Sequence, residues 1–361
     1  MPDSAHLILV GRYPPPLGGN TIHLARLVGR LTTDRRQLTV VDVYNPGCGE
    51  FDQSNPHTLN FSRLTGWRAT RHLHLLGRLR ERVCDAIVHF HISAGANFYR
   101  YAALVGPLTR KARRRVLTIH SGGWVGGFEA LSRRKQERAL RVISSFDDVI
   151  CVNEQQQAVL SRHVSTRLHL IPAYLPPPLT EPVPIPEPVH LLQQAVDVLI
   201  VTSGYGTPVY DYATVLRGIE IAQRRVSIRL GLVVATYTNW DQGYWAQILG
   251  QLRNSPVPAV TSTDLSPSQF LAVLAQAGLY VRATLTDGDA VAIREAASVG
   301  TRVLASDAVT RPQGTALFRK GDAEGLGQLL VEAFQEREFG RLPIDAFPDS
   351  YGEILKVYGG S

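Results

Sequence analysis

Short apolar runs alternate with amphipathic segments along most of the chain. The run Leu7–Val10 is predicted to be a buried strand, a proline- and glycine-containing loop follows it, and a helix is predicted to start near Thr21. The same order of strand, loop and helix recurs from Val198, and again from Leu279 to the strand that begins at Arg302. This repetition predicts an α/β protein with doubly wound parallel sheets, in which ligands bind beyond the carboxyl ends of the strands.

A proline-rich stretch over residues 172–188 divides the pattern in two, and such a stretch is typical of a stiff connector. A chain of 361 residues also fits two domains, at about 150 residues each. We therefore expect an N-terminal Rossmann-like domain over residues 1–175, a linker over 176–190 and a C-terminal Rossmann-like domain over 191–340. Residues 341–361 are expected to form a helix that packs back on the first domain.

Charge is distributed unevenly between the two halves. Residues 1–175 hold 24 Lys and Arg against 12 Asp and Glu, whereas the remainder of the chain is net acidic. Arginines alternate with leucines over residues 61–82, which predicts basic amphipathic helices that bind an anionic membrane or, alternatively, form an ordinary solvated face. A nucleic-acid partner has only the charge in its favour and is not expected. The arginines expected to form the membrane and acceptor surface are Arg68, Arg71, Arg78, Arg113, Arg114 and Arg115.

Composition favours a soluble globular protein in a reducing compartment. Hydrophobic residues make up 44% of the chain, mean hydropathy is −0.04, and no apolar run approaches the roughly 18–20 residues of a membrane span. The start of the sequence lacks the charged region of a signal peptide. Three scattered cysteines indicate a reducing compartment rather than a disulfide framework.

Two carboxylates flank a glycine turn that opens a predicted helix. Asp287 precedes the turn at Gly288, and Glu295 lies within the helix. A helix N-terminus offers free N–H groups and a partial positive charge, so it suits an anion or a polarised sugar hydroxyl. The alternative is that Asp289 caps the helix and Glu295 is a solvated surface residue.

Three histidines fall on predicted strands of the first domain. His89 and His91 share one face of a strand, because side chains alternate along it. A metal pair is conceivable there, but without a third ligand nearby we favour histidines that line the core or a site, and no metal is expected. His120 ends the strand that starts at Val116, ahead of a glycine-rich loop, so it is placed to face a ligand.

The combination of these features resembles glycosyltransferase family 4 over nearly the whole chain. Asp287–Glu295 is similar to the family's Glu-x7-Glu motif, with the strand Val303–Asp307 following as in the family. The loop Pro14–Gly19, the strand ending at His120 and the segment Gly321–Leu326 are similar to three further family segments. The resemblance implies the GT-B fold, an α/β architecture of two Rossmann-like doubly wound domains facing across a cleft.

One departure concerns the donor diphosphate. The family's Gly-Arg and Lys-Gly pair is absent, and Tyr205 and Tyr210 stand in its place, as in a subgroup with Asp-Gly-Asp at the motif. The diphosphate must then be met by backbone amides, by the helix start or by arginine, and Arg282 is favoured over Arg294, which is expected to point outward. The residues expected to bind the donor are Gly18, Gly19, Tyr205, Tyr210, Arg282, Gly288, Asp289, Ala290, Val291 and Glu295.

The resemblance further implies a retaining hexosyltransferase that needs no cofactor or metal. Its donor would be a UDP- or GDP-linked sugar, and its acceptor a glycan or lipid-linked glycan of bacterial surface polysaccharide (exopolysaccharide, capsule or O-antigen) synthesis, at the inner face of the cytoplasmic membrane. His120 and Asp287 would be the catalytic residues in contact with the sugar, and Glu295 would hold the ribose. Two alternatives remain, a catalytically silent GT-B subunit that supports a partner enzyme and a sugar-nucleotide epimerase.

Overall fold

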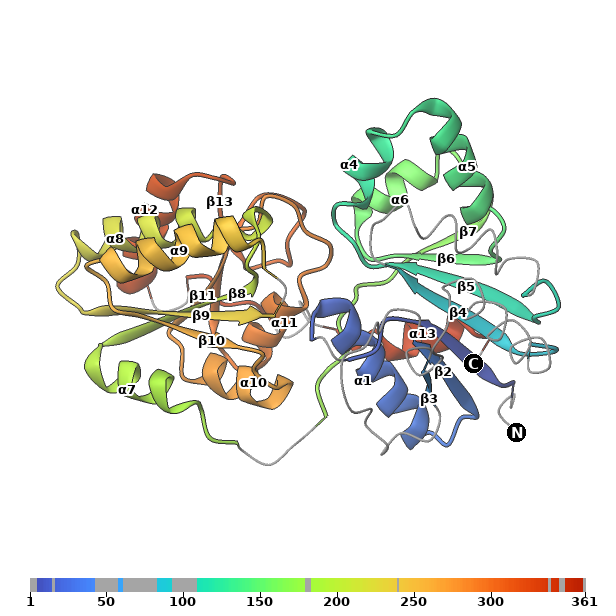
Figure 1. The fold of residues 1–361 in the computed structure, drawn as a ribbon, viewed down its shortest axis with the longest axis horizontal. Helices are drawn as coiled ribbons and strands as arrows, with labels where there is room; N and C mark the ends of the chain where they lie inside the picture. The colour runs from blue at the N-terminus through green and yellow to red at the C-terminus, as the bar shows by residue number, and fades with distance from the viewer. Residues whose placement is uncertain are drawn as a thin grey trace. The chain divides into compact units, whose positions relative to one another are not determined.

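A computed structural model of the protein describes residues 5–14, 17–42, 58–60, 83–92, 109–178, 183–238, 240–336, 339–343 and 348–359. The chain forms two compact α/β units (Figure 1). The first consists of Met1–Pro15, Asn20–Leu175 and Asp349–Ser361, and the second of Pro16–Gly19 and Pro176–Pro348. None of the described helices is both long and apolar enough to span a membrane.

The first unit is built on a seven-stranded parallel sheet with the order β3-β2-β1-β4-β5-β6-β7. Leu7 in the interior strand β1 pairs with Leu38 on one side and Ile87 on the other. The strands are β1 (Leu7–Gly11), β2 (Leu38–Asp42), β3 (Thr58–Asn60), β4 (Ile87–Ile92), β5 (Arg114–Ile119), β6 (Asp148–Cys151) and β7 (Arg167–Leu170).

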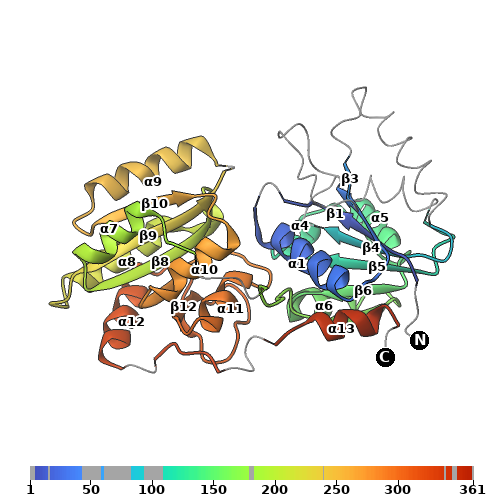
Figure 2. The same cartoon turned by 90° about the horizontal axis from the view of Figure 1, so that it is seen from below.

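Helices cover both faces of this sheet (Figure 1, Figure 2). Ile8 and Val10 pack on the face covered by α4, α5 and α6, whereas Leu7 and Leu9 pack on the face covered by α1 and α13. Burial on both faces explains why the run Leu7–Val10 of β1 is apolar at every position rather than at alternate ones. The helices are α1 (Gly19–Thr33), α4 (Trp124–Glu129), α5 (Arg133–Ile143), α6 (Glu154–Leu160) and α13 (Tyr351–Val357).

The second unit repeats the plan with a six-stranded sheet in the order β10-β9-β8-β11-β12-β13. Its pairings are parallel throughout the described strands. The strands are β8 (Val198–Tyr205), β9 (Leu230–Tyr237), β10 (Ala259–Thr263), β11 (Leu279–Arg282), β12 (Arg302–Ser306) and β13 (Ala316–Phe318). The helices are α7 (Glu187–Ala195), the 3-10 turn η1 (Pro208–Tyr210), α8 (Tyr212–Gln223), α9 (Gln242–Asn254), α10 (Pro267–Ala275), α11 (Val291–Ser298) and α12 (Ala323–Gln335).

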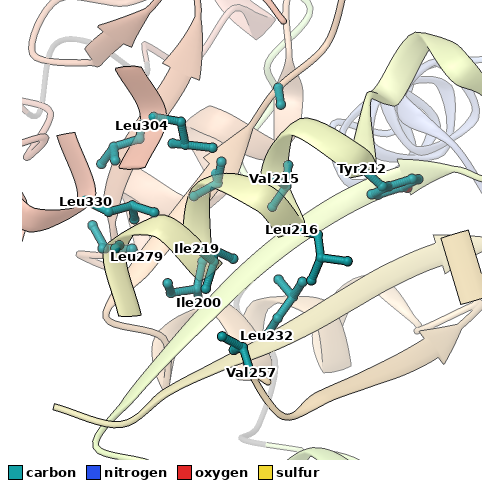
Figure 3. Packing of buried hydrophobic residues seen from close by; sticks show 14 of the residues in the cluster. Ile200, Tyr212, Val215, Leu216, Ile219, Leu232, Val257, Leu279, Leu304 and Leu330 are labelled. Atoms are coloured by element: carbon teal, nitrogen blue, oxygen red, sulfur yellow. The ribbon is translucent and has the colours of Figure 1, made fainter. Parts of the chain in front are cut away.

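Two apolar layers hold this sheet between its helices. Figure 3 shows the layer in which Val215 and Ile219 of α8 lie over Ile200 of β8, with Leu330 of α12 beside Leu304. The opposite layer is formed by α7, α10 and α11 against the alternate strand positions. The carboxyl ends of β8, β11 and β12 are therefore held rigidly side by side, and the loops that follow them carry the candidate site.

Several sequence predictions need adjustment. The helix expected near Thr21 begins at Gly19, and α7 begins at Glu187, inside the predicted linker. Residues 341–361 include the expected helix, α13, which belongs to the first unit. The predicted basic helices over residues 61–82, with Arg68, Arg71 and Arg78, lie outside the described residues.

Candidate functional site

The turn between β11 and α11 carries the predicted motif, and α11 begins at Val291, three residues after Gly288. Ala290 occupies the N-cap position, and its side chain forms no capping hydrogen bond. Asp289, considered as the cap, instead accepts hydrogen bonds from Arg294 Nε at 2.9 and 3.1 Å. Arg294 is buried, so the expectation that it points outward is wrong. As at other helix N-termini, the backbone N–H groups and the partial positive charge of the first turn of α11 favour an anion.

Asp287 is the centre of a buried ionic network. Its Oδ1 accepts hydrogen bonds from Arg282 Nη2 and the Gly288 amide, both at 3.1 Å. Its Oδ2 accepts from Arg282 Nε at 2.9 Å, Arg311 Nη1 at 2.9 Å and Thr284 Oγ1 at 3.0 Å. Burial favours the neutral acid, but the two guanidinium groups outweigh it and hold the pKa of Asp287 well below its usual range. The carboxylate expected to hold sugar hydroxyls thus positions two arginines.

Arg311 was missed by the sequence analysis. It follows β12, and its Nε donates to the carbonyl of Ser306 at 3.0 Å while its Nη2 donates to Thr284 Oγ1 at 3.0 Å. Because β11 and β12 are parallel neighbours, with Arg282 paired to Ala305, the residues after both strands meet at one edge of the sheet. An arginine a few residues beyond the neighbouring strand was the signal that could have identified it.

The network has an unbalanced charge. Arg282 and Arg311 contribute two positive charges against one negative charge on Asp287, and the three side chains are 11%, 2% and 9% exposed. Burial of unbalanced charge costs free energy, and an anion bound beside these groups would offset it. The edge formed by β11, β12 and the start of α11 is therefore suited to bind an anionic group.

Two tyrosines line the same edge. The Arg282 guanidinium lies 5.1 Å from the centre of the Tyr210 ring, and burial raises the pKa of Tyr210 to about 12, so its hydroxyl is a neutral donor at physiological pH. A Cβ on Gly204 would lie 1.9 Å from a Tyr210 ring atom, so glycine is what allows this ring to pack against the strand end. Tyr205 contacts Tyr210 at 6.0 Å between ring centres.

In the glycine loop after β1, the space beside Gly18 is already occupied by a side chain of the protein. The hydroxyl of Tyr205 donates to the carbonyl of Leu17 at 3.0 Å, and a Cβ on Gly18 would lie 2.1 Å from that hydroxyl. The close approach that Gly18 permits is therefore used by a tyrosine of the protein itself. A Cβ on Gly19 would meet nothing within 4 Å. Donor binding by either glycine stays a prediction.

Glu295 is buried on α11, so the alternative of a solvated surface residue is wrong. It lies close enough to Tyr237 that, after burial itself, its negative charge raises the pKa of that phenol. Both observations place Glu295 inside the second unit, on the helix that starts beside the anion-suited edge. Its role in ribose binding stays a prediction.

The first unit gathers four histidines on one side of its sheet. His89 and His91 share a face as predicted, with ring centres 4.0 Å apart. His23 from α1 joins them, its ring centre 5.6 Å from that of His91 and 4.7 Å from that of His120. The absence of a third nearby histidine, on which the sequence argument against a metal depended, is therefore contradicted. His23 could have been found as a buried-face position of the predicted helix.

Burial keeps these imidazoles neutral. It lowers the pKa of His23 to about 4 and that of His89 to about 3, and it holds the pKa values of His91 and His120 well below the usual range. His89 is fully engaged, because its Nδ1 lies 2.6 Å from the Tyr358 hydroxyl and its Nε2 lies 2.7 Å from Thr118 Oγ1. The other three rings surround a common point at the carboxyl ends of β4 and β5.

The described arginines of the predicted basic surface differ in their exposure and contacts. Arg113 is exposed, as the membrane hypothesis requires. Arg114 contacts Asp148 at 3.6 Å and donates to the carbonyl of Val357, so it joins α13 to the sheet, and its part in an acceptor surface stays a prediction. The guanidinium of Arg115 lies 6.0 Å from the centre of the Phe146 ring.

Comparison with known proteins supports the architecture. No family model matches the sequence, and no curated protein matches it. Among solved structures, sucrose-phosphate synthase from Thermosynechococcus elongatus is similar at 16% identity and a TM-score of 0.67, over 98% of this chain and 95% of that chain. Anabaena HepE in complex with UDP-glucose is similar at 13% identity and a TM-score of 0.69, over 98% and 95% of the chains.

A third similar structure is the N-terminal domain of Candida albicans trehalose-6-phosphate phosphatase, at 12% identity and a TM-score of 0.71, over 99% of this chain and 97% of that chain. Identities this low establish the fold and nothing finer. The two parallel sheets flanked by helices, matched over nearly the full length of these structures, show that this chain has the α/β architecture of GT-B glycosyltransferases.

Proposed function

We propose that this protein is a retaining glycosyltransferase that moves a sugar from a nucleotide-diphosphate sugar to a glycan or lipid-linked glycan in surface polysaccharide synthesis. The observation that carries the proposal is the network of Arg282, Asp287 and Arg311 at the carboxyl edge of β11 and β12. It lies beside the start of α11, in a chain with the fold of nucleotide-sugar enzymes.

The chemistry explains why such a network is useful. Sugar transfer releases a nucleoside diphosphate, so groups that stabilise its developing negative charge lower the barrier. Two guanidinium groups fixed by one carboxylate replace the basic pair that the sequence lacks, and they need no reorganisation during the reaction. Asp287 acts as a positioning residue in this scheme, Glu295 holds the ribose, and His120 contacts the donor sugar.

The similar structures suggest which donor to test first. HepE was solved with UDP-glucose and with UDP and glucose, and a trehalose-6-phosphate protein from E. coli with UDP-2-fluoro glucose. UDP-glucose therefore leads a panel of UDP- and GDP-linked sugars. The first readout is the shift in melting temperature on donor addition, and the second is donor hydrolysis or transfer to acceptor extracts.

One variant tests the network directly. Arg311→Gln removes one guanidinium but leaves Asp287 paired with Arg282, so we expect the protein to fold and its donor affinity to fall by about tenfold or more, since charged hydrogen bonds contribute about 1.5–3 kcal/mol. Arg253→Gln changes an exposed arginine of α9 in the same unit and serves as the matched control. If no sugar nucleotide raises the melting temperature of the wild type, the proposal fails. Binding without turnover would favour the silent GT-B subunit.

For the acceptor, we propose a lipid-linked glycan at the inner face of the cytoplasmic membrane, reached through the basic first half of the chain. Salt-sensitive binding to anionic vesicles would support this, whereas equal binding to neutral and anionic vesicles would contradict it. The test variant replaces three arginines of residues 61–82 with glutamine, and the control variant replaces three exposed arginines of the second unit. The test set is Arg68, Arg71 and Arg78, and the control set is Arg224, Arg253 and Arg319.

A further inference from the structure

Three histidines from separate elements converge within the first unit. His23 comes from α1, His91 from β4 and His120 from the end of β5. One ring nitrogen from each lies within 4.8 Å of the others. No other His, Cys, Asp or Glu of the described chain joins the group. A tetrahedral zinc ion holds its imidazole nitrogens about 3.3 Å apart, so modest side-chain movement would bring the three to bonding distance.

The hydrogen bonds leave nitrogens free to coordinate. His23 Nδ1 lies 2.6 Å from the carbonyl oxygen of Ala173, which can only accept, so Nδ1 carries the proton and Nε2 presents a lone pair. His23 Nε2 and His91 Nε2 are buried, and neither has a hydrogen-bond partner within the described structure. A buried nitrogen without a partner costs free energy, and a bound metal ion would satisfy it.

The contact between His91 and His120 also bears on metal binding. His91 Nδ1 lies 3.0 Å from His120 Nε2, so in the metal-free protein one of these two nitrogens donates its proton to the other, while His91 Nε2 has no partner among the described residues. Histidine ligands in metal sites commonly donate their second N–H to a backbone carbonyl, which fixes the tautomer and the ring orientation. The bond from His23 to Ala173 is such a contact, and it joins α1 to the strand-ending segment after β7.

We propose that His23, His91 and His120 form a binding site for a divalent transition-metal ion, with zinc the preferred ion and the fourth position open. Three imidazole nitrogens suit Zn²⁺, Co²⁺, Ni²⁺ or Cu²⁺, whereas Mg²⁺ and Ca²⁺ prefer oxygen ligands. Three protein ligands with one open position are the arrangement of reactive rather than purely structural zinc sites. His89 is outside the set, because both its nitrogens are bonded to Thr118 and Tyr358.

The site lies wholly within the first unit, and its ligand set does not depend on the proposed sugar transfer. His120 is shared, since it is also the histidine expected to contact the donor sugar. Metal binding is measured by calorimetry and donor binding by the shift in melting temperature, so the metal-site proposal and the donor-binding proposal can fail independently.

The experiment titrates metal-free full-length protein with Zn²⁺, Co²⁺ and Mg²⁺ by calorimetry. We expect one saturable site for Zn²⁺ and Co²⁺, none for Mg²⁺, and the intense visible absorption of tetrahedral cobalt. Loss of an outer contact to a metal ligand typically costs 10–100-fold in affinity, so loss of a ligand in His91→Gln should weaken Zn²⁺ binding by on the order of 100-fold or more. His190→Gln is the matched control, because His190 is exposed on α7 and pairs with Gln194.

Folding of each variant is checked by its melting temperature without metal. If His91→Gln does not fold, the cobalt spectrum of the wild type and the variants His23→Gln and His120→Gln decide the matter. A wild type that binds no Zn²⁺ at one equivalent, or a cobalt spectrum of octahedral type, overturns the proposal. Unchanged Zn²⁺ affinity in all folded variants overturns it as well, whatever the donor panel shows.

Discussion

At the scale of single residues, Asp287 has more partners than a motif carboxylate aimed at a ligand would need. Its two oxygens accept hydrogen bonds from Arg282, Arg311, Thr284 and the Gly288 amide. Removal of its charge leaves two buried guanidinium groups without their carboxylate. We therefore expect Asp287→Asn to lower the free energy of unfolding at pH 7 by about 3–5 kcal/mol, as for other broken buried ion pairs.

The pH dependence of this effect has a definite sign. The pKa of Asp287 is lowered in the folded state from its ordinary value of 3.8, so its contribution is complete well above pH 3.8 and is lost as the pH falls below that value. Urea unfolding of wild type and variant should therefore differ by the full amount at pH 7, and the difference should begin to shrink only as the pH falls below 3.8. Asp241→Asn is the control, since asparagine caps α9 as well as aspartate does. Equal stability of wild type and Asp287→Asn at pH 7 would contradict the network.

Donor binding gives a second test of the same residue. An anionic diphosphate beside Arg282 and Arg311 would partly replace the missing carboxylate charge in Asp287→Asn. We expect the best donor of the panel to raise the melting temperature of this variant by more than it raises that of the wild type. A smaller shift in the variant would mean that Asp287 itself binds the donor, as the sequence first suggested.

At the scale of elements, α8 and α12 pack closely through glycines. A Cβ on Gly327 of α12 would lie 2.9 Å from Ile221 Cβ and 3.1 Å from the carbonyl oxygen of Gly218, both on α8. Neither atom is the end of a flexible side chain, so the helices themselves must separate. Gly327→Ala should therefore lower the stability of the second unit by about 1–3 kcal/mol, the usual cost of overpacking.

Gly250 on α9 provides the matched control, because a Cβ there would meet nothing within 4 Å. Gly250→Ala should raise stability by roughly 0.5–1 kcal/mol through helix propensity alone. Urea unfolding of the two variants measures the contrast. If both substitutions stabilise the protein, the close α8–α12 packing is wrong.

The elements also show which features could be predicted from the sequence and which could not. Runs such as Leu7–Val10 predicted strands because parallel strands are buried on both faces, and the turn around Asp287 lies within a few residues of its partner Arg282. Arg311 and His23 were missed because strand order, not local spacing, brings them to their sites. The contacts of Arg114 could not be predicted for the same reason, since Asp148 and Val357 are far from it in sequence.

At the scale of the whole molecule, the chain returns to its first unit after the second is complete. Residues Asp349–Ser361 belong to the first unit, where Tyr351, Ile354 and Val357 of α13 pack against the β1 and α1 layer. Tyr358 contacts His89 in the histidine cluster. The packing of the first unit around His89 therefore depends on a residue 269 positions away in sequence.

Ile354→Ala tests this dependence, because Ile354 is 2% exposed and its truncation leaves a cavity under the sheet. Large-to-small substitutions at such sites cost about 2–5 kcal/mol. Hydrogen exchange measured by mass spectrometry should show faster exchange throughout the first unit and unchanged exchange in β8–β13 of the second. Glu353→Ala, which changes an exposed neighbour paired with Lys356, should leave both units within about 0.5 kcal/mol of the wild type. Equal acceleration in both units would mean that the two unfold as one, and the assignment of α13 to the first unit alone would then fail.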